Sequence, residues 1–166
     1  MHPIARIAEL ATIGAGTIIG PRATVGQSVT IGQNIVIGED ASIGDGTTVY
    51  NGAHVGNLVF THFGVEIGDS ARIGHGVRIG SKVSVGLLAT VRDWAELSAW
   101  VKVGKRARIG KHAAIGFRAT VGASSRIGKH AVIRPSVRIG DWVEIGKRCR
   151  ISANIAHGAV IPSQPR

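Results

Sequence analysis

A six-residue repeat keeps its phase along almost the whole chain and constrains the fold more than any other feature. Steps of six from Ile7 to Ile151 give 25 positions, of which 24 are aliphatic and 18 are followed directly by glycine. The exception among the aliphatic positions is Thr61. A second column of uncharged residues lies four positions after each member of the first, from Ala11 to Ile161. A short repeat sustained in this way indicates a solenoid.

The repeat predicts a chain of short strands and tight corners. The two inward residues of each hexad are separated by one outward residue, which is the alternation of a half-buried strand. The Gly-x-x segment after the aliphatic predicts a corner, where glycine suits a positive φ. Three hexads close one triangular coil of 18 residues, and parallel coils stack about 4.8 Å apart. We therefore expect one domain of nine coils over residues 1–162, without inserted loops, and a tail at 163–166.

Individual hexads carry a resemblance to a known family. Residues 43–48 (IGDGTT) and 127–132 (IGKHAV) match the pattern aliphatic-Gly-x-x-small-x residue by residue. The chain resembles the hexapeptide-repeat transferase superfamily, which implies an all-β, left-handed parallel β-helix. That handedness is an exception to the general rule for parallel crossovers. The superfamily contains acyltransferases, γ-class carbonic anhydrases and non-catalytic members, so the resemblance alone leaves the activity open.

Positive charge is concentrated in the second part of the chain. The sequence holds 20 Lys and Arg against 10 acidic residues, a net charge of +10. Steps of 18 align Lys111, Lys129 and Lys147 in one column and Arg108 with Arg126 in another. Stacked like charges repel one another unless an anion relieves them. The pattern predicts either a solubilising face or a site for an anionic ligand. Coenzyme A fits such a site, and the resemblance places it along the later coils.

Other partners and locations are constrained more simply. We do not expect nucleic acid, because no aromatic platform interleaves the basic residues. No apolar run reaches the length of a membrane-spanning helix. The repeat begins within the first hexad, which leads us to expect no leader and a cytoplasmic location.

Two histidines are the candidate chemical groups, and both interpretations of them come from the resemblance. His62 and His75 fall where γ-class carbonic anhydrases have two of three zinc ligands, but the third position is Gly80. A catalytic zinc site would therefore be incomplete, and we expect no metal. Resemblance to the acyltransferases implies a general base instead, with His75 as the first candidate and His62 as the second. The simpler alternative is that both are exposed histidines without a role.

Large apolar residues cluster at positions that the repeat places outside the core. They are Leu58, Phe60, Phe63, Trp94 and Trp100. An exposed apolar patch usually marks an interface. The resemblance implies a parallel homotrimer with active sites in the clefts between subunits.

Two inward positions hold less usual residues. Thr61 stands in the aliphatic column, where its hydroxyl is expected to bond a neighbouring carbonyl. The single cysteine, Cys149, stands in the second column and is interpreted as a buried packing residue.

Three functions remain open on the sequence. The first is an acyltransferase that uses acetyl-CoA to modify a hydroxyl or amine in an intersubunit groove. The second is a non-catalytic structural solenoid, natural or idealised, that assembles through its faces or by end-to-end contacts. The third is a degenerate relative of the γ-class carbonic anhydrases.

Overall fold

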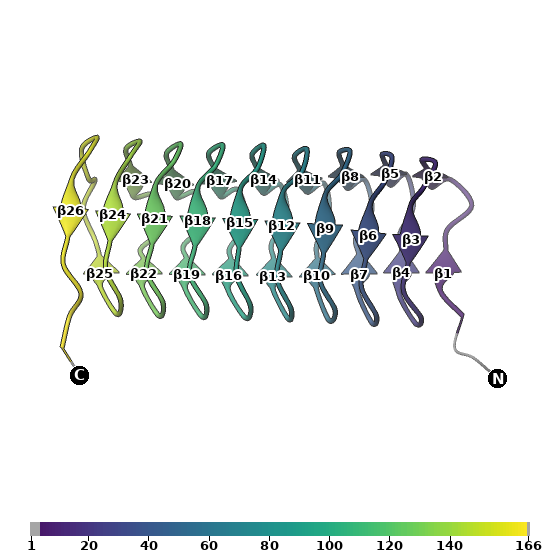
Figure 1. The fold of residues 1–166 in the computed structure, drawn as a ribbon, viewed down its shortest axis with the longest axis horizontal. Helices are drawn as coiled ribbons and strands as arrows, with labels where there is room; N and C mark the ends of the chain where they lie inside the picture. The colour runs from purple at the N-terminus through teal and green to yellow at the C-terminus, as the bar shows by residue number, and fades with distance from the viewer. Residues whose placement is uncertain (1–3, 166) are drawn as a thin grey trace.

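The computed structural model describes residues 4–165, which form a straight prism built from 26 two-residue strands and their corners. Figure 1 shows the strands stacked as successive rungs along the long axis, with the two termini at opposite ends. Residues 1–3 and 166, the outermost residues of the predicted domain and tail, lie outside the described part. The structure confirms the predicted all-β fold, a parallel β-helix of about nine coils. Residues 4–165 include no helix that could cross a membrane.

The strands form three parallel sheets, one on each face of the prism. The first sheet contains, in order, β1 (Arg6–Ile7), β4 (Thr24–Val25), β7 (Ser42–Ile43), β10 (Phe60–Thr61), β13 (Arg78–Ile79), β16 (Glu96–Leu97), β19 (Ala114–Ile115), β22 (Val132–Ile133) and β25 (Arg150–Ile151). The second contains β2 (Thr12–Ile13), β5 (Thr30–Ile31), β8 (Thr48–Val49), β11 (Glu66–Ile67), β14 (Ser84–Val85), β17 (Lys102–Val103), β20 (Thr120–Val121) and β23 (Arg138–Ile139). The third contains β3 (Ile18–Ile19), β6 (Val36–Ile37), β9 (His54–Val55), β12 (Arg72–Ile73), β15 (Thr90–Val91), β18 (Arg108–Ile109), β21 (Arg126–Ile127), β24 (Glu144–Ile145) and β26 (Val160–Ile161). We call the turns that follow these sheets corner 1, corner 2 and corner 3.

Strand register follows the 18-residue step. In the third sheet, for example, Arg108 pairs with Arg126 and Ile109 pairs with Ile127. The second residue of a strand points inward, and Ile109 is fully buried, whereas the residue before it is exposed. The core is therefore a stack of aliphatic and small side chains, and every outward side chain belongs to a column that runs along the prism.

The glycines that open the corners have a different physical cause from the predicted one. Gly128 does not have a positive φ, but a Cβ placed on it would lie 2.4 Å from the backbone carbonyl of Gly146 in the next coil. A side chain there would collide with backbone that cannot move aside. Positive φ occurs instead at the third corner residue, which is usually not glycine, as at Trp94 (φ 58°) and Ser136 (φ 61°). The leading glycines therefore permit close stacking of coils.

The last coil is shorter than predicted. Ile139 bridges to Ile155 and Ile145 pairs with Ile161, a step of 16 residues where earlier coils use 18. Two residues are therefore missing from the corner after β25. The prediction that Ile161 belongs to the second, small-residue column is wrong, because it continues the aliphatic column of the third sheet.

The two unusual inward residues are accommodated in the backbone ladder. The Thr61 hydroxyl accepts a hydrogen bond from the Gly44 N–H at 2.9 Å. The equivalent amide of Gly26 donates to a carbonyl, that of Ile43. The prediction that the Thr61 hydroxyl bonds a carbonyl is thus corrected. The hydroxyl instead takes the place of a backbone carbonyl as the acceptor of the Gly44 N–H. Cys149 is buried as predicted, and its Sγ lies 3.1 Å from the Pro162 carbonyl.

Candidate functional site

Corner 3 brings the candidate base into line with the predicted basic column. The middle residues of successive turns at this corner are Asn57, His75, Asp93, Lys111, Lys129 and Lys147. The His75 backbone N–H donates to Asp93 Oδ1 at 3.1 Å, and Asp93 Oδ2 lies 2.7 Å from Lys111 Nζ. The 18-residue step that aligned the three lysines would also have found this line, because it leads from Lys111 back to His75.

The five cations predicted to bind a cofactor line a single hollow of about 640 Å³ over the late coils of the third sheet. We call it the basic groove; its polar lining residues are Arg92, Arg108, Lys111, Arg126, Lys129, Lys147 and Ser163. Lys111 pairs with Asp93, and Arg126 pairs with Glu144 at 2.7 Å. Within residues 4–165, Lys129 and Lys147 have no carboxylate partner, so the groove retains excess positive charge that attracts anions.

The salt bridge with Lys111 also keeps Asp93, which lies between His75 and the lysines, in its charged form. The hydrogen bond from Lys111 lowers the pKa of the Asp93 carboxyl, and the backbone N–H of His75 contributes in the same direction. Asp93 is therefore ionised at neutral pH and holds the Lys111 ammonium group in place.

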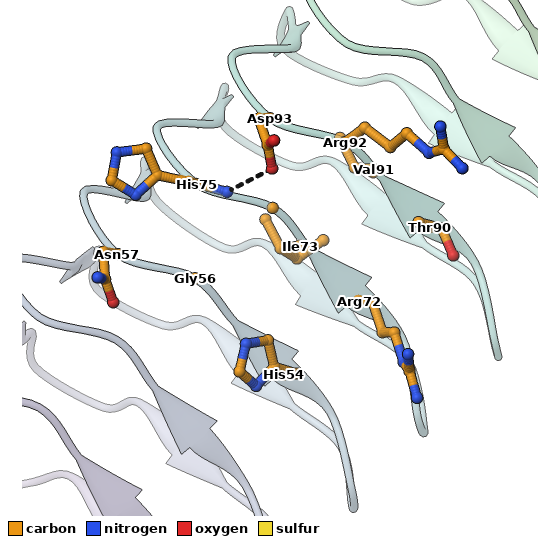
Figure 2. Close-up of a pocket in the computed structure, with 11 residues that line it drawn as sticks. His54, Gly56, Asn57, Arg72, Ile73, His75, Thr90, Val91, Arg92 and Asp93 are labelled. Atoms are coloured by element: carbon orange, nitrogen blue, oxygen red, sulfur yellow. Dashed lines mark hydrogen bonds between the residues drawn. The ribbon is translucent and has the colours of Figure 1, made fainter.

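A second hollow, of about 390 Å³, adjoins the basic groove toward the N-terminal end. His54, Arg72 and Arg92 line it, and Arg92 belongs to both hollows. Figure 2 shows the guanidinium groups of Arg72 and Arg92 on one side of corner 3 and the imidazole of His75 on the other. His54, Arg72 and Arg92 were not among the residues predicted from the sequence. The available signal was Arg92, because it interrupts the column of glycines that opens corner 3.

His75 itself is partly exposed and positioned by its neighbours. Its imidazole and the Trp94 ring form a T-shaped pair, with centroids 5.2 Å apart and an interplanar angle of 76°. No side chain among residues 4–165 hydrogen bonds to the imidazole, which leaves both ring nitrogens free for a ligand.

His62 does not share a hollow with His75. It lines a separate one, of about 750 Å³, over the first sheet, together with Phe60, Trp94 and Gly80. Because Thr61 pairs with Ile79, Gly80 lies beside His62 in the next coil, and it has no side chain to offer a metal. No three His, Cys, Asp or Glu residues within 4–165 are grouped to bind an ion. The donor set does not fit a three-ligand zinc site.

The five predicted interface residues are all exposed, with between 43% and 54% of their surface accessible. Leu58, Phe60 and Trp94 line the hollow over the first sheet. Phe63 and Trp100 lie on corner 1, where the Lys82 ammonium group sits 4.4 Å from the centre of the Phe63 ring. The structure thus divides them into two clusters that border the first sheet.

Comparison with known proteins agrees with the repeat and the fold. A family model described as "Hexapeptide repeat of succinyl-transferase" matches residues 11–39. The chain is also similar to solved structures of UDP-N-acetylglucosamine acyltransferases. The Francisella novicida enzyme has a TM-score of 0.85 and 20% identity over 93% of this chain. The Bacteroides fragilis enzyme has a TM-score of 0.87 and 22% identity over 93% of this chain.

The family model matches a short stretch of the repeat, and the solved structures share the fold of the whole solenoid. The chain spans 62% of the Francisella chain and 68% of the Bacteroides chain. A third match, the Arabidopsis UDP-N-acetylglucosamine acyltransferase, has a TM-score of 0.62 and 18% identity over 95% of this chain and 66% of its own. No curated protein matches the sequence significantly. At these identities the likeness establishes the fold, and the activity must be argued from the site.

Proposed function

We propose that this hexapeptide-repeat protein is an acyltransferase that binds acetyl-CoA in the basic groove and modifies a hydroxyl or amine. The observation that carries the proposal is the line of corner 3. It places the candidate base, His75, in the same column as the lysines that would hold the phosphates. The fold is that of solved acyltransferases, which supports the same class of reaction.

The groove residues fit a phosphate-bearing ligand. Lys129 and Lys147 offer ammonium groups without carboxylate partners, and Arg108 offers a guanidinium group suited to paired contacts with phosphate oxygens. Acetyl-CoA, when bound, supplies an acyl group activated as a thioester. The groove runs along the prism toward His75, so a ligand held at its far end can extend along the column.

His75 is proposed as the general base. With both ring nitrogens free, its imidazole can accept the proton of an acceptor hydroxyl or amine. Trp94 packs against the ring and limits its rotation. His62 is the second candidate, but it lies in a different hollow from the lysines.

A homotrimer would complete the site. A corner of a prism is open to solvent on one side, and an acyl transfer requires a water-restricted site. Leu58, Phe60 and Trp94 lie close to corner 3 and offer an apolar surface for a second chain. We propose that a neighbouring subunit covers this side and encloses His75.

The proposal is tested by calorimetric titration of acetyl-CoA into the wild type and into the triple variant Lys111→Gln, Lys129→Gln, Lys147→Gln. We expect the triple variant to bind at least about tenfold more weakly, because charge-assisted contacts to phosphate are lost. The salt dependence of binding should flatten at the same time, because fewer exposed charges take part.

A matched control removes the same charge elsewhere. Lys102→Gln, Lys105→Gln, Arg138→Gln changes the second sheet and corner 2, and it should bind acetyl-CoA like the wild type. Equal weakening in both variants would mean that net charge, and not the groove, attracts the ligand. Absence of acetyl-CoA binding to the wild type would overturn the proposal.

The second candidate is a structural solenoid, and one observation favours it. The coils within residues 4–165 have no inserted loop to cover a substrate, and the one departure from the 18-residue step is the shortened last coil. Regular faces of this kind suit repeated contacts between copies. A wild type that assembles but does not bind acetyl-CoA would favour this function.

A further inference from the structure

Two histidines are stacked at the apex of corner 3, beside the lysines of the basic groove. The rings of His112 and His130 are nearly parallel, at an interplanar angle of 9°, and their centroids are 5.0 Å apart. We call this pair the histidine stack. The proposed acyl transfer gives these two residues no part.

The surroundings of the histidine stack are strongly positive. In its own turns, His112 follows Lys111 and His130 follows Lys129, and the next turn of corner 3 adds Lys147 and Arg148. Asp93, in the turn before, is the one carboxylate that reaches this line of cations in residues 4–165, and it is engaged by Lys111.

The flanking sheets add few compensating charges. On the third sheet the nearest outward residues are Arg108, Arg126 and Glu144, and Arg126 and Glu144 pair with each other. On the first sheet Ala114 and Val132 are uncharged. The outward residues on either side of them are Arg150, which is again a cation, and Glu96, which lies 3.8 Å from Arg78.

Such an environment opposes protonation of the stack. Desolvation lowers the pKa of His130 below its ordinary value, and the charges of Lys129, His112 and Arg148 lower it further. A second positive ring 5.0 Å away would add to the repulsion. An anion in contact with the same cations has the opposite effect, because it favours the charged form of each imidazole.

We propose that the histidine stack, next to the basic groove on corner 3, forms with the neighbouring lysines a proton-coupled site for phosphate or sulfate groups, which binds them more tightly as the pH falls. The inference rests on the groove of the proposed function, but it requires only an oxyanion there. It assigns a role to His112, His130 and Arg148 together with Lys129 and Lys147. Because coupling is reciprocal, the bound anion must also raise the pKa of His130.

The experiment is a proton NMR titration of the imidazole resonances in sodium sulfate and in sodium chloride at equal ionic strength. Sulfate is the probe because it does not itself titrate where imidazole does. We expect the pKa of His130 to be higher in sulfate than in chloride by about half a pH unit or more. His112→Gln and His130→Gln variants assign the two resonances. The exposed His62, which opens corner 1 and lies outside the basic groove, is the internal reference.

A double variant, Lys129→Gln with Lys147→Gln, separates a specific site from general screening. Its His130 should have a higher pKa than the wild type in chloride, because the repelling charge of Lys129 is gone. The additional rise in sulfate should disappear. Equal pKa values of His130 in the two salts for the wild type, or an undiminished sulfate effect in the double variant, would overturn the inference.

The outcome is distinguishable from that of the proposed function. Binding of acetyl-CoA without a sulfate-specific rise in the pKa of His130 would keep the acyltransferase proposal and overturn this one. A sulfate-specific rise in the pKa of His130 in a protein that does not bind acetyl-CoA would keep this inference and overturn the acyltransferase proposal.

Discussion

At the scale of the residue, the backbone imposes two different constraints within each corner, one on the leading residue and one on the third. The leading glycine lies under the backbone of the next coil, as Gly128 lies under Gly146, and has no room for a Cβ. The third residue has a positive φ but faces solvent, so side chains as large as Trp94 occupy it. Close packing between coils therefore restricts the residue type at the leading position more strictly than the positive φ restricts it at the third position.

Gly128→Ala should destabilise the protein by about 1–3 kcal/mol, although its φ is not positive, because the added methyl overpacks the stack. Ser136→Gly at a positive φ of 61° should change stability by less than about 1 kcal/mol. In that case the relief of strain is offset by a larger loss of chain entropy. Chemical denaturation followed by circular dichroism compares the two variants. If Ser136→Gly were the more damaging change, our account of the corner would be wrong.

At the scale of the element, each strand contributes one inward and one outward side chain to columns that run through the sheet. β18 illustrates the contrast: Ile109 is fully buried between its neighbours, and Arg108 is exposed. Corner side chains tie the coils together as well. Asp45, Asn51 and Asp141, for example, each accept a hydrogen bond from a backbone N–H 18 residues earlier. An element is thus stabilised by the coils above and below it more than by its own sequence.

Ile109→Asp should cost more than about 4 kcal/mol of stability or prevent folding, because it combines a lost aliphatic group with an unpaired buried charge. Arg108→Asp introduces the same side chain one residue earlier, on the exposed side, and should cost less than about 1 kcal/mol. Thermal and urea unfolding give both values. Similar losses in the two variants would contradict the assignment of inward and outward faces.

At the scale of the whole molecule, the exposed groups are distributed unevenly over a regular prism. The basic groove lies over the late coils of the third sheet, and the hollow lined by Phe60, His62 and Trp94 lies over the middle of the first. Corner 3 separates the two and carries His75. This arrangement places a chemically distinct surface on each side of one edge, which suits a site completed by a second subunit.

Light scattering should give about three chains per particle for the wild type. The two exposed apolar clusters on either side of the first sheet give each chain two different contact faces, and heterologous contacts can close into a ring. Phe60→Glu with Trp94→Glu should give single chains, since both residues line the hollow over the first sheet. Trp142→Glu is the matched control, because Trp142 is exposed on corner 2, away from that face. A wild-type monomer would contradict the prediction. Particles that grow with concentration, and shrink again at high salt, would instead indicate end-to-end stacking.

The sequence by itself determined the architecture of this protein. A period of six fixes which side chains are buried, and a period of 18 fixes which ones form a column, since both follow from local geometry repeated without interruption. The solenoid, the buried Cys149 and the column of Lys111, Lys129 and Lys147 could therefore be read from the chain. The same step also leads to His75, although that connection was recognised only when corner 3 was seen as a whole.

Contacts between coils decided the rest. The glycines at the corners, the hydroxyl of Thr61 in the backbone ladder and the 16-residue last coil depend on atoms that meet only after stacking. The basic groove also exists only in three dimensions, because Arg92 and Arg108 join the lysines across the edge of a sheet. A repeat specifies the average coil, and the departures from it that could support chemistry are settled by the particular neighbours each residue acquires.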